Sequence, residues 1–342
     1  MLEENMIGLS FDDVLLVPAY SEVESRNDIS LKQKKVIGKY SLDVPIISAN
    51  MDTITGYEMA YAMKELGGLG IIHRYMTIKE AVSMANTWFR TETSPIALSV
   101  GCLKKDKERI DKFVKNYRNK NIILCVDIAH GHSKNMKDTL IYLRQELNFK
   151  GAIIAGNVCT PQATQQLVLW GADIVKVGVG PGSACTTRIK TGCGFAQFTA
   201  IQRCSKVGPI IADGGIKSSG DAAKALAAGA KAVMIGGMLA GTDKTPNWNL
   251  KHESIEFRGM ASPEARFEFE GVSKNAEGVS CLVERKSTGS TSDTIKYLTE
   301  GIKSAMSYVG AGTLSIFSSR TKFSKVTTAV VCENTPHILE KV

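Results

Sequence analysis

Cys185 is the residue best placed for covalent chemistry in this sequence. It lies in the segment GVGPGSACTTR, residues 178–188, whose glycines and proline predict a loop with main-chain groups free to face a ligand. A thiol near main-chain amides and a cation such as Arg188 ionises more readily and can act as a nucleophile. A lone cysteine is more often a buried structural residue, but Cys185 lies outside any apolar run, which favours the nucleophile.

Two glycine turns predict a phosphate site. The turns are ADGG, residues 212–215, and IGGM, residues 235–238, and each follows a short apolar run. Main-chain N–H groups at such strand–helix turns bind anions, and Asp213 offers an acceptor that suits ribose hydroxyls. The alternative is that these glycines only make tight turns, without any ligand.

Eight short apolar runs, each bounded by turn residues, must position these loops. They span Val44–Ser48, Gly70–His73, Ile96–Val100, Ile122–Val126, Ala152–Ala155, Ile174–Gly178, Ile210–Ala212 and Ala232–Gly236. Continuous hydrophobicity of this kind is typical of parallel strands that are buried on both faces.

Amphipathic segments alternate with these runs and predict helices. They span Gly56–Leu66, Met76–Arg90, Asp106–Tyr117, Ser133–Leu147, Thr160–Trp170, Phe195–Lys206, Ser219–Ala228 and Thr294–Val309. Thr77 and Glu80 have the spacing of a capping box. Eight strand–helix units predict an α/β fold of the (β/α)8 TIM-barrel type. A doubly wound open sheet is the alternative, but no G-x-G-x-x-G follows an early strand.

Polar, acidic and glycine residues follow nearly every predicted strand, at the end of such a barrel where active sites lie. They include Asn50–Asp52, His73 with Arg74, Asp127 and Asn157. His73 and Arg74 are a candidate anion contact. His130 and His132 follow Asp127, but no further ligand cluster is visible, so we interpret them as polar loop residues rather than a metal site.

Two segments lie outside the repeat. Residues before about Leu42 form an N-terminal extension, and residues 242 to about 291 form a long polar insertion after the eighth strand. Because long loops in compact domains are often functional, we expect the insertion to be a lid over the barrel mouth. We expect residues 1–342 to form a single barrel domain with no inserted regulatory domain.

Composition and charge exclude several classes of protein. The net charge is +8, but the Lys and Arg residues are scattered and no basic stripe with interleaved aromatic residues suggests nucleic acid as a partner. None of the eight cysteines forms a C-x-x-C pair, so a thiolate zinc site is not expected. No signal peptide or membrane-spanning run is visible, which predicts a cytoplasmic protein without a membrane partner.

Several motifs in order along the chain resemble the family of IMP dehydrogenases and GMP reductases. They are LSFDDVLLVPAYSEVESR, PIISANMDT, IVKVG, GPGSACTTR, ADGGI, IGGMLAG and RGMAS. The similarity covers essentially the whole chain. The reductase branch is favoured by the residues around Cys185, by the uninterrupted early barrel units, by the C-terminal segment SYVGAGTL, and by the lack of an Arg–Tyr pair between Thr242 and Thr291.

The resemblance implies an NADPH-dependent reductive deamination of GMP to IMP and ammonia, in purine salvage and interconversion. Cys185 would attack C2 of the guanine to form a covalent thioimidate, and Thr187 and Glu277 would relay the proton that the leaving amine needs. A short IMP dehydrogenase, or a purine-nucleotide-binding barrel without catalysis, remains an alternative.

The resemblance also implies binding residues. The nucleotide would be bound by Met51, Ser183, Asp213, Gly214, Gly215, Gly236, Gly237, Gly259, Met260, Ala261, Lys274 and Gly278. The cofactor would be bound by Ser25, Arg26, Asp127, Ile128, Ala129, Val179 and Gly180. A monovalent cation, K+, would be held mainly by the main-chain carbonyls of Gly180, Gly182, Cys185 and Arg188. The family suggests a homotetramer in which Ser25 and Arg26 serve a neighbouring subunit.

The chain departs from the reductase pattern at two positions of the insertion. Lys274 stands where the reductases have an arginine, which keeps the charge but loses the planar fork. Ala261 stands where a serine is usual. Both changes concern the affinity for ligands and leave the Cys185–Thr187–Glu277 set intact.

Overall fold

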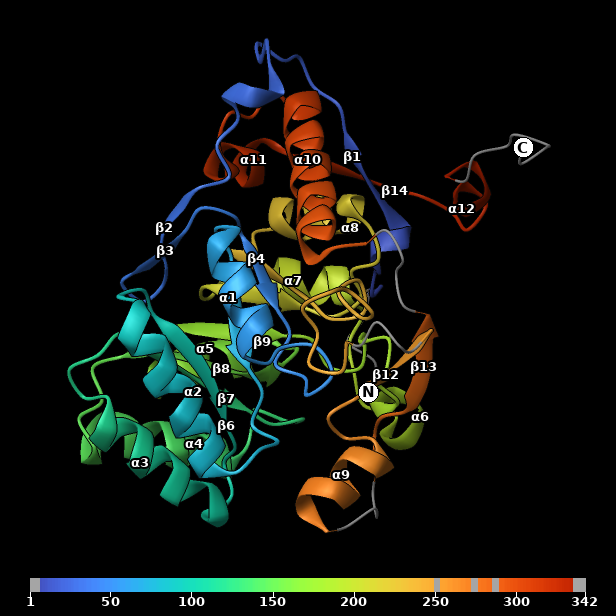
Figure 1. Ribbon diagram of the computed structural model, residues 1–342. Helices are drawn as coiled ribbons and strands as arrows, with labels where there is room; N and C mark the ends of the chain where they lie inside the picture. Colours follow the sequence, from blue (N-terminus) through green and yellow to red (C-terminus); the bar gives the residue numbers. More distant parts are fainter. Residues whose placement is uncertain (1–6, 249–252, 272–275, 285–288, 335–342) are drawn as a thin grey trace.

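The computed structural model is a closed barrel of eight parallel strands, the TIM barrel that the strand and helix pattern predicts (Figure 1). It describes residues 7–248, 253–271, 276–284 and 289–334. The strands follow one another around the barrel in chain order from β4 to β11, and β11 pairs with β4 to close it. All eight predicted strands form, with ends within three residues of those expected.

The barrel strands are β4 (Ile46–Ser48), β5 (Leu69–Ile72), β6 (Ile96–Val100), β7 (Ile122–Asp127), β8 (Ala152–Val158), β9 (Ile174–Val177), β10 (Ile210–Asp213) and β11 (Ala232–Ile235). The described strands outside it are β1 (Val14–Val17), β2 (Gln33–Ile37), β3 (Tyr40–Leu42), β12 (Ser254–Arg258), β13 (Ser280–Glu284) and β14 (Lys322–Lys325).

The helices of the repeat are α1 (Tyr57–Glu65), α2 (Ile78–Thr91), α3 (Lys107–Asn116), α4 (Lys134–Ile141), α5 (Pro161–Leu169), α7 (Gln197–Cys204), α8 (Ser219–Ala227) and α10 (Thr291–Val309). Further helices are α6 (Thr187–Thr191), α9 (Pro263–Glu270), α11 (Leu314–Arg320) and α12 (Val330–Glu333). Short 3-10 helices are η1 (Phe11–Asp13), η2 (Arg26–Asp28) and η3 (Lys104–Asp106), and η4 (Tyr142–Glu146) is a π-helical turn that continues α4.

Local capping explains where the helices begin. The predicted capping box of Thr77 and Glu80 forms at the start of α2. The expected start of α10 at Thr294 was wrong, because Ser290 caps the helix and forms a capping box with Asp293, so α10 begins at Thr291.

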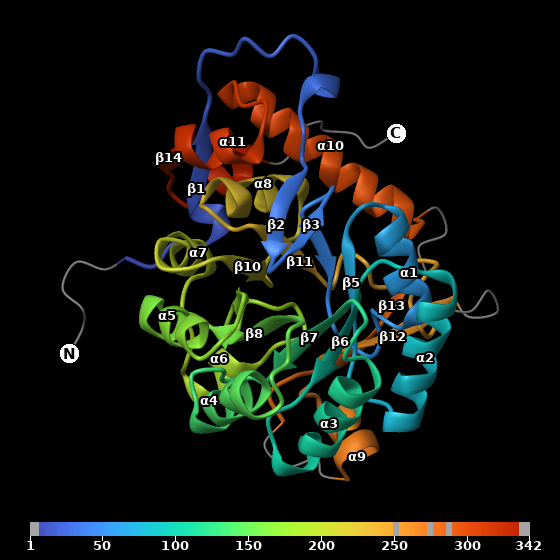
Figure 2. The ribbon, with the colours of Figure 1, turned by 90° about the vertical axis from the view of Figure 1, so that its left-hand side faces the viewer.

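The strands are buried on both faces because two separate cores lie against them. Side chains of alternate strand residues fill the interior of the barrel, while the others pack under the helices. These helices surround the barrel strands in Figure 2. The N-terminal extension is part of this packing, because the β2–β3 hairpin adds Val36, Ile37 and Leu42 to the interior core. The barrel is therefore a filled scaffold, and only its loops can hold a ligand.

The long insertion has its own secondary structure. Strands β12 and β13 pair in an antiparallel two-stranded sheet, and α9 lies between them in the chain. In Figures 1 and 2, α9 lies at the end of the molecule away from α11. At the α11 end, β1 pairs with β14, so residues 14–17 of the N-terminal extension are joined there to residues 322–325. Below, the lid means residues 254–271 and 276–284, which include β12, α9 and β13.

Candidate active site

The loop with Cys185 follows β9 and lies against the lid. Cys185 forms an isolated antiparallel bridge with Gly278. The amide of Thr186 donates to the carbonyl of Glu277 at 2.9 Å, and the amide of Val279 donates to the carbonyl of Ala184 at 3.0 Å. These main-chain bonds place the lid segment beside the loop, although the two are about ninety residues apart in sequence. The expected contact between the insertion and the barrel mouth is therefore present.

The three residues predicted to act together form one hydrogen-bonded chain. The Cys185 thiol donates to Thr187 Oγ1, with 3.2 Å between Sγ and Oγ1. The same hydroxyl donates to Glu277 Oε2 at 2.9 Å. Thr187 is the first residue of α6, while Glu277 reaches the chain from the lid. A proton can therefore pass between the thiol and the carboxylate through a single hydroxyl.

The predicted phosphate and ribose residues surround the same loop. A Cβ added to Gly237 would lie 2.9 Å from Ser183 Oγ, so the glycine turn after β11 approaches the Cys185 loop closely. A Cβ on Gly236 would lie 3.3 Å from Met51 Sδ. Gly214, in the turn after β10, has a positive φ of 91° and lies against Pro181. Only glycine combines this backbone conformation with such close approach of the turn to the Cys185 loop.

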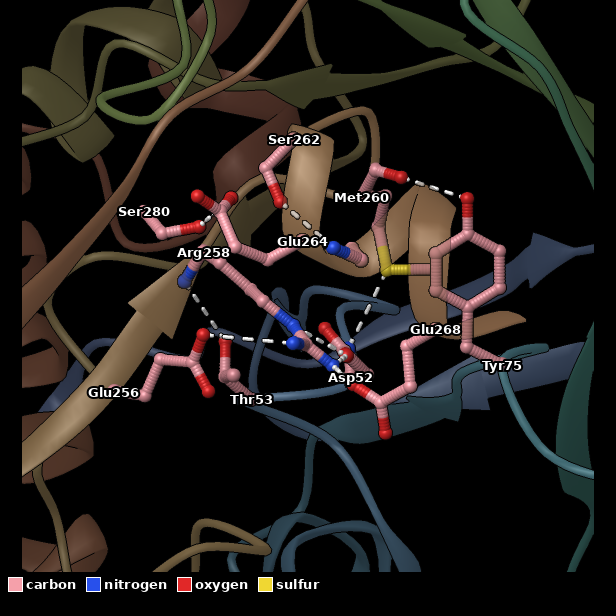
Figure 3. Close-up of polar contacts among 11 residues, drawn as sticks. Asp52, Thr53, Tyr75, Glu256, Arg258, Met260, Ser262, Glu264, Glu268 and Ser280 are labelled. Atoms are coloured by element: carbon pink, nitrogen blue, oxygen red, sulfur yellow. Dashed lines mark hydrogen bonds and ion pairs between the residues drawn. The ribbon is translucent and has the colours of Figure 1, made fainter. Parts of the chain in front are cut away.

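A buried ion pair anchors the lid to the barrel (Figure 3). Arg258, the last residue of β12, donates through Nη2 to Asp52 Oδ2 at 2.5 Å, and both side chains are less than one-tenth exposed. Glu268 on α9 also binds this guanidinium, at 2.7 Å. Next to this pair, the Tyr75 hydroxyl donates to the carbonyl of Met260 at 2.7 Å, and the amide of Asp52 contacts Met260 Sδ at 3.4 Å. Met260 is thereby held over the loop that follows β4.

A buried lysine joins two of the predicted ligand carboxylates. Lys176 lies on β9, and its Nζ is 2.5 Å from Asp127 Oδ1 at the end of β7 and 3.2 Å from Asp213 Oδ2 at the end of β10. Asn50 donates to Asp127 at 3.0 Å, and Asn157 donates to Asp213 at 2.8 Å. The sequence reasoning did not single out Lys176 as a site residue. The available signal was a lone charge inside the apolar strand run IVKV.

Charge attraction keeps Lys176 and Asp127 ionised. Burial alone would raise the pKa of Asp127, but the ammonium of Lys176 outweighs it and leaves that pKa below its ordinary value. Burial would likewise lower the pKa of Lys176, but Asp127 and Asp213 raise it well above its ordinary value. We therefore treat the lysine and the Asp127 carboxylate as charged at neutral pH.

Other predicted site residues lie close to this centre. Ile128 follows Asp127 and exchanges main-chain hydrogen bonds with the Gly156–Asn157 segment, and Ala129 follows it in the chain. The carbonyl of Ala261 accepts the amide of Glu277 at 3.0 Å. A Cβ on Gly259 or on Gly278 would lie 2.8 Å or 3.2 Å from the carbonyl oxygen of Ala184, so both glycines pack on the Cys185 loop.

Arg188 directs its hydrogen bonds at main-chain carbonyls of its own loop. Its Nε donates to the carbonyl of Val179 at 3.2 Å, and its Nη2 donates to the carbonyl of Phe195 at 2.5 Å. Its side chain packs on Gly180, where a Cβ would lie 2.4 Å from Arg188 Cγ. The arginine thus holds the loop through its main-chain carbonyls. The sequence spacing suggested instead that its charge lies beside the Cys185 thiol.

Two predicted cofactor residues lie apart from the rest of the site. Ser25 caps η2, and Arg26 is its first residue. The segment that follows is fixed to the α10–α11 turn, because the amide of Ser30 donates to the carbonyl of Gly312 at 3.0 Å. Lys274 lies outside the described residues.

The structure gives the state of His73 and a partner for His132. Burial, reinforced by Arg109 and Arg258, lowers the pKa of His73 to about 4, so this imidazole is neutral at neutral pH and is not a cationic anion contact. His132 bonds to Gln166 at 2.8 Å. Across the described ranges, no three His, Cys, Asp or Glu side chains group as a metal site. In the same ranges, no helix combines the length and apolarity that a membrane span needs.

Comparison with known proteins gives a consistent family. Residues 8–337 match the family model of the IMP dehydrogenase / GMP reductase domain. A GMP reductase of Vibrio atlanticus (strain LGP32) is 36% identical over 337 residues, which cover 94% of this chain and 96% of that protein. An inosine-5'-monophosphate dehydrogenase of Cryptosporidium parvum is also 36% identical, over 397 aligned positions that cover 98% of this chain and 96% of that protein.

A solved structure matches the whole fold. A cysteine-to-alanine variant of GMP reductase from Trypanosoma brucei, in complex with guanosine 5'-monophosphate, superposes with a TM-score of 0.86 at 26% sequence identity. The match covers 98% of this chain and 98% of that one.

Proposed function

The chain belongs to the IMP dehydrogenase/GMP reductase family of oxidoreductases, and we propose that it is a reductase that converts GMP and NADPH to IMP, ammonia and NADP+. The observation that supports this most directly is the hydrogen-bonded chain from the Cys185 thiol through Thr187 to Glu277. Removal of an amino group needs an acid beside the nucleophile, and the hydrogen-bonded chain that ends at Glu277 supplies one.

The hydrogen bonds from Cys185 through Thr187 to Glu277 can serve two proton transfers of the deamination, ionisation of the thiol and protonation of the leaving amino group. Thr187 accepts the thiol proton while donating its own proton to Glu277, which leaves a Cys185 thiolate and a protonated Glu277 carboxyl. The thiolate forms a bond to C2 of the guanine. The C2–N bond then breaks as the amino group takes the proton back from Glu277 through Thr187 and leaves as ammonia. The product is a thioimidate on Cys185, and the thiol proton has become the third hydrogen of ammonia.

The residues around Cys185 suit a purine nucleotide. The glycine turns at Gly214–Gly215 and Gly236–Gly237, with Ser183, would bind the phosphate, and Asp213 would accept from the ribose. Met51, Gly259 and Met260 would flank the base, next to Ala261 and Gly278. Lys274, which lies outside the described residues, would contribute a positive charge to nucleotide binding.

The barrel mouth also has groups that fit the nicotinamide cofactor. Asp127, Ile128, Ala129, Val179 and Gly180 would hold it, and Asn157 Oδ1 is a buried acceptor with no hydrogen-bond partner in the structure. When bound, NADPH supplies the hydride that replaces the Cys185 sulfur at C2. Since Ser25 and Arg26 lie at the α10–α11 turn, they would serve the site of a neighbouring subunit in a homotetramer.

The loop before α6 and the first turn of α6 have oxygen ligands of the type that K+ prefers. The proposed ligands are the carbonyl oxygens of Gly180, Gly182, Cys185 and Arg188. Gly182 accepts the amide of Cys185, and Arg188 accepts the amide of Gly192. Each of these two oxygens keeps a second lone pair, so the hydrogen bonds are compatible with a cation. A bound K+ would stiffen the loop that presents Cys185. The proposed location of the enzyme is the cytoplasm.

A short IMP dehydrogenase is the second candidate, because the Cryptosporidium dehydrogenase is as similar in identity as the Vibrio reductase. Two observations favour the reductase. The alignment with the dehydrogenase spans 397 positions, more than the 342 residues of this chain, so it includes dehydrogenase segments that this chain lacks. The alignment with the reductase spans 337 positions. The sequence from Thr242 to Thr291 also contains no tyrosine that could pair with an arginine to activate water.

The decisive assay follows reduced-nicotinamide absorbance. Purified protein is mixed with GMP and NADPH, and in parallel with IMP and NAD, while ammonia is measured. The reductase predicts GMP-dependent oxidation of NADPH with stoichiometric ammonia. Cys185→Ala should abolish it, whereas Cys193→Ala, which changes an exposed cysteine beyond α6, should leave it intact. IMP-dependent reduction of NAD would establish the dehydrogenase instead, and inactivity of both mixtures would favour a non-catalytic nucleotide-binding barrel.

A further inference from the structure

Lys176 is a buried charge at the barrel mouth that the proposed mechanism leaves unused. Its residue is 2% exposed, and it lies inside the barrel because it is two residues from Ile174, which belongs to the interior core. Its Nζ contacts Asp127 on one side and Asp213 on the other, and it approaches Asn50 Oδ1 at 3.4 Å. The side chain thus crosses the barrel mouth from β9 to the ends of β7 and β10.

A buried ion cluster of this kind is a costly way to fill a barrel. Removing an ammonium and two carboxylates from water has a large desolvation penalty, and apolar residues of similar volume often stabilise such a position equally well. The interior positions below it are in fact apolar, including Ile123 on β7 and Ile211 on β10. The position of the cluster, directly above these layers, indicates a role at the mouth.

Each carboxylate is oriented by Lys176 together with one amide. Asn50 holds Asp127, and Asn157 holds Asp213. Each amide reaches one carboxylate, whereas Lys176 forms an ion pair with both. A change in the position of the lysine therefore alters the ion pairs of both carboxylates.

We propose that Lys176 is a positioning residue that couples the nucleotide side of the site, at Asp213, to the cofactor side, at Asp127. This inference rests on the proposed function, which assigns Asp213 to the ribose of the nucleotide and Asp127 to the cofactor. A ligand that orders one carboxylate orders the lysine, and through it the other carboxylate. The second ligand then binds to a site that is already ordered, so the two ligands bind with positive cooperativity.

The test measures binding without turnover. In a Cys185→Ala background, calorimetry gives the dissociation constant of GMP with and without saturating NADPH, and that of NADPH with and without GMP. We expect each ligand to lower the dissociation constant of the other by about fivefold or more, which is the lower end of typical coupling. Lys176→Met should weaken both ligands by about tenfold or more and bring the coupling factor close to one. Lys176→Arg, which keeps the charge, should restore part of both effects.

Two further variants separate positioning from folding. Lys224→Met removes a half-buried lysine of α8 that binds the carbonyl of Phe11, and it should leave the coupling unchanged. The double variant Lys176→Met/Asp127→Asn keeps the net charge of the cluster, so it tests the link even where Lys176→Met alone does not fold. Coupling that persists in the double variant, or weakening of only one ligand by Lys176→Met, would overturn the proposal.

Failure of the proposed function has a different signature. Wild-type protein that oxidises no NADPH with GMP contradicts the reductase, and the binding experiment is then repeated with IMP and NAD+. Because the binding measurement in the Cys185→Ala background needs no turnover, its result for Lys176→Met does not depend on the activity assay.

Discussion

Replacing Asp52 with asparagine should release the lid from the barrel. Asp52 is the buried partner of Arg258, with side-chain exposures of 5% and 9%. Arg258 ends β12, the strand that continues into Gly259 and Met260. The asparagine keeps the size of the side chain and removes its charge, so the effect should come from the lost ion pair rather than from a cavity.

The expected cost follows from the burial of the pair. Removing one partner of a buried ion pair destabilises by about 3–5 kcal/mol, because the other charge stays buried. Arg258 keeps two more exposed carboxylates, Glu268 at 2.7 Å and Glu256 at 3.4 Å, whose side chains are 55% and 38% exposed. Pairs of that kind contribute about 0–1 kcal/mol each. Because these two carboxylates still neutralise part of the charge on Arg258, we take the lower end of that range, about 3 kcal/mol, and reduce it by up to about 1 kcal/mol. The expected net cost is then about 2–3 kcal/mol, or about 30- to 150-fold in the equilibrium for lid opening.

Hydrogen exchange of the lid measures this cost directly. The amide of Val279 is bonded to the carbonyl of Ala184, so it exchanges only when the lid leaves the Cys185 loop. Asp52→Asn should accelerate its exchange about 30- to 150-fold, while the amides of the barrel strands keep their protection.

Glu256→Gln is the matched control, since it removes a more exposed carboxylate from the same guanidinium. It should accelerate exchange by less than about fivefold, as expected for a pair worth under about 1 kcal/mol. Equal protection of Val279 in Asp52→Asn and wild type would refute the reasoning that the Arg258 pair holds the lid closed.

Three further predictions concern the chemistry and the nucleotide. Cys185→Ala should reduce turnover by at least about a thousandfold while GMP still binds, and a substantial residual rate would exclude the covalent mechanism. Glu277→Gln should slow ammonia release in a single turnover by about 10²–10⁴-fold and change GMP affinity little, whereas Glu284→Gln, on an exposed part of β13, should react at the wild-type rate. Gly237→Ala should raise the KM for GMP by about tenfold or more, because its Cβ would lie 2.9 Å from the Ser183 hydroxyl. Gly312→Ala, where a Cβ meets nothing within 4 Å, should leave the KM for GMP unchanged. An unchanged KM in Gly237→Ala would remove that turn from the nucleotide site.

The sequence by itself determined the barrel and most of its element boundaries. The eight apolar runs are continuous because barrel strands are buried on both faces, and that requirement is readable residue by residue. Local hydrogen bonds such as the Thr77–Glu80 capping box could be predicted for the same reason, since both partners lie within one turn. Ser290 and Asp293 have the same spacing and begin α10 before the predicted start, because residues 291–293 are polar and apolar spacing does not reveal a polar first turn.

The contacts that complete the site were decided only by the tertiary structure. Thr187 and Glu277 are 90 positions apart, and Arg258 and Asp52 are 206 apart, so no local pattern relates them. Lys176 was overlooked because its two carboxylates come from other strands, 49 residues before it and 37 residues after it. Closure of the barrel brings the ends of β7, β9 and β10 around one mouth, and burial there requires the lysine and the carboxylates to neutralise one another.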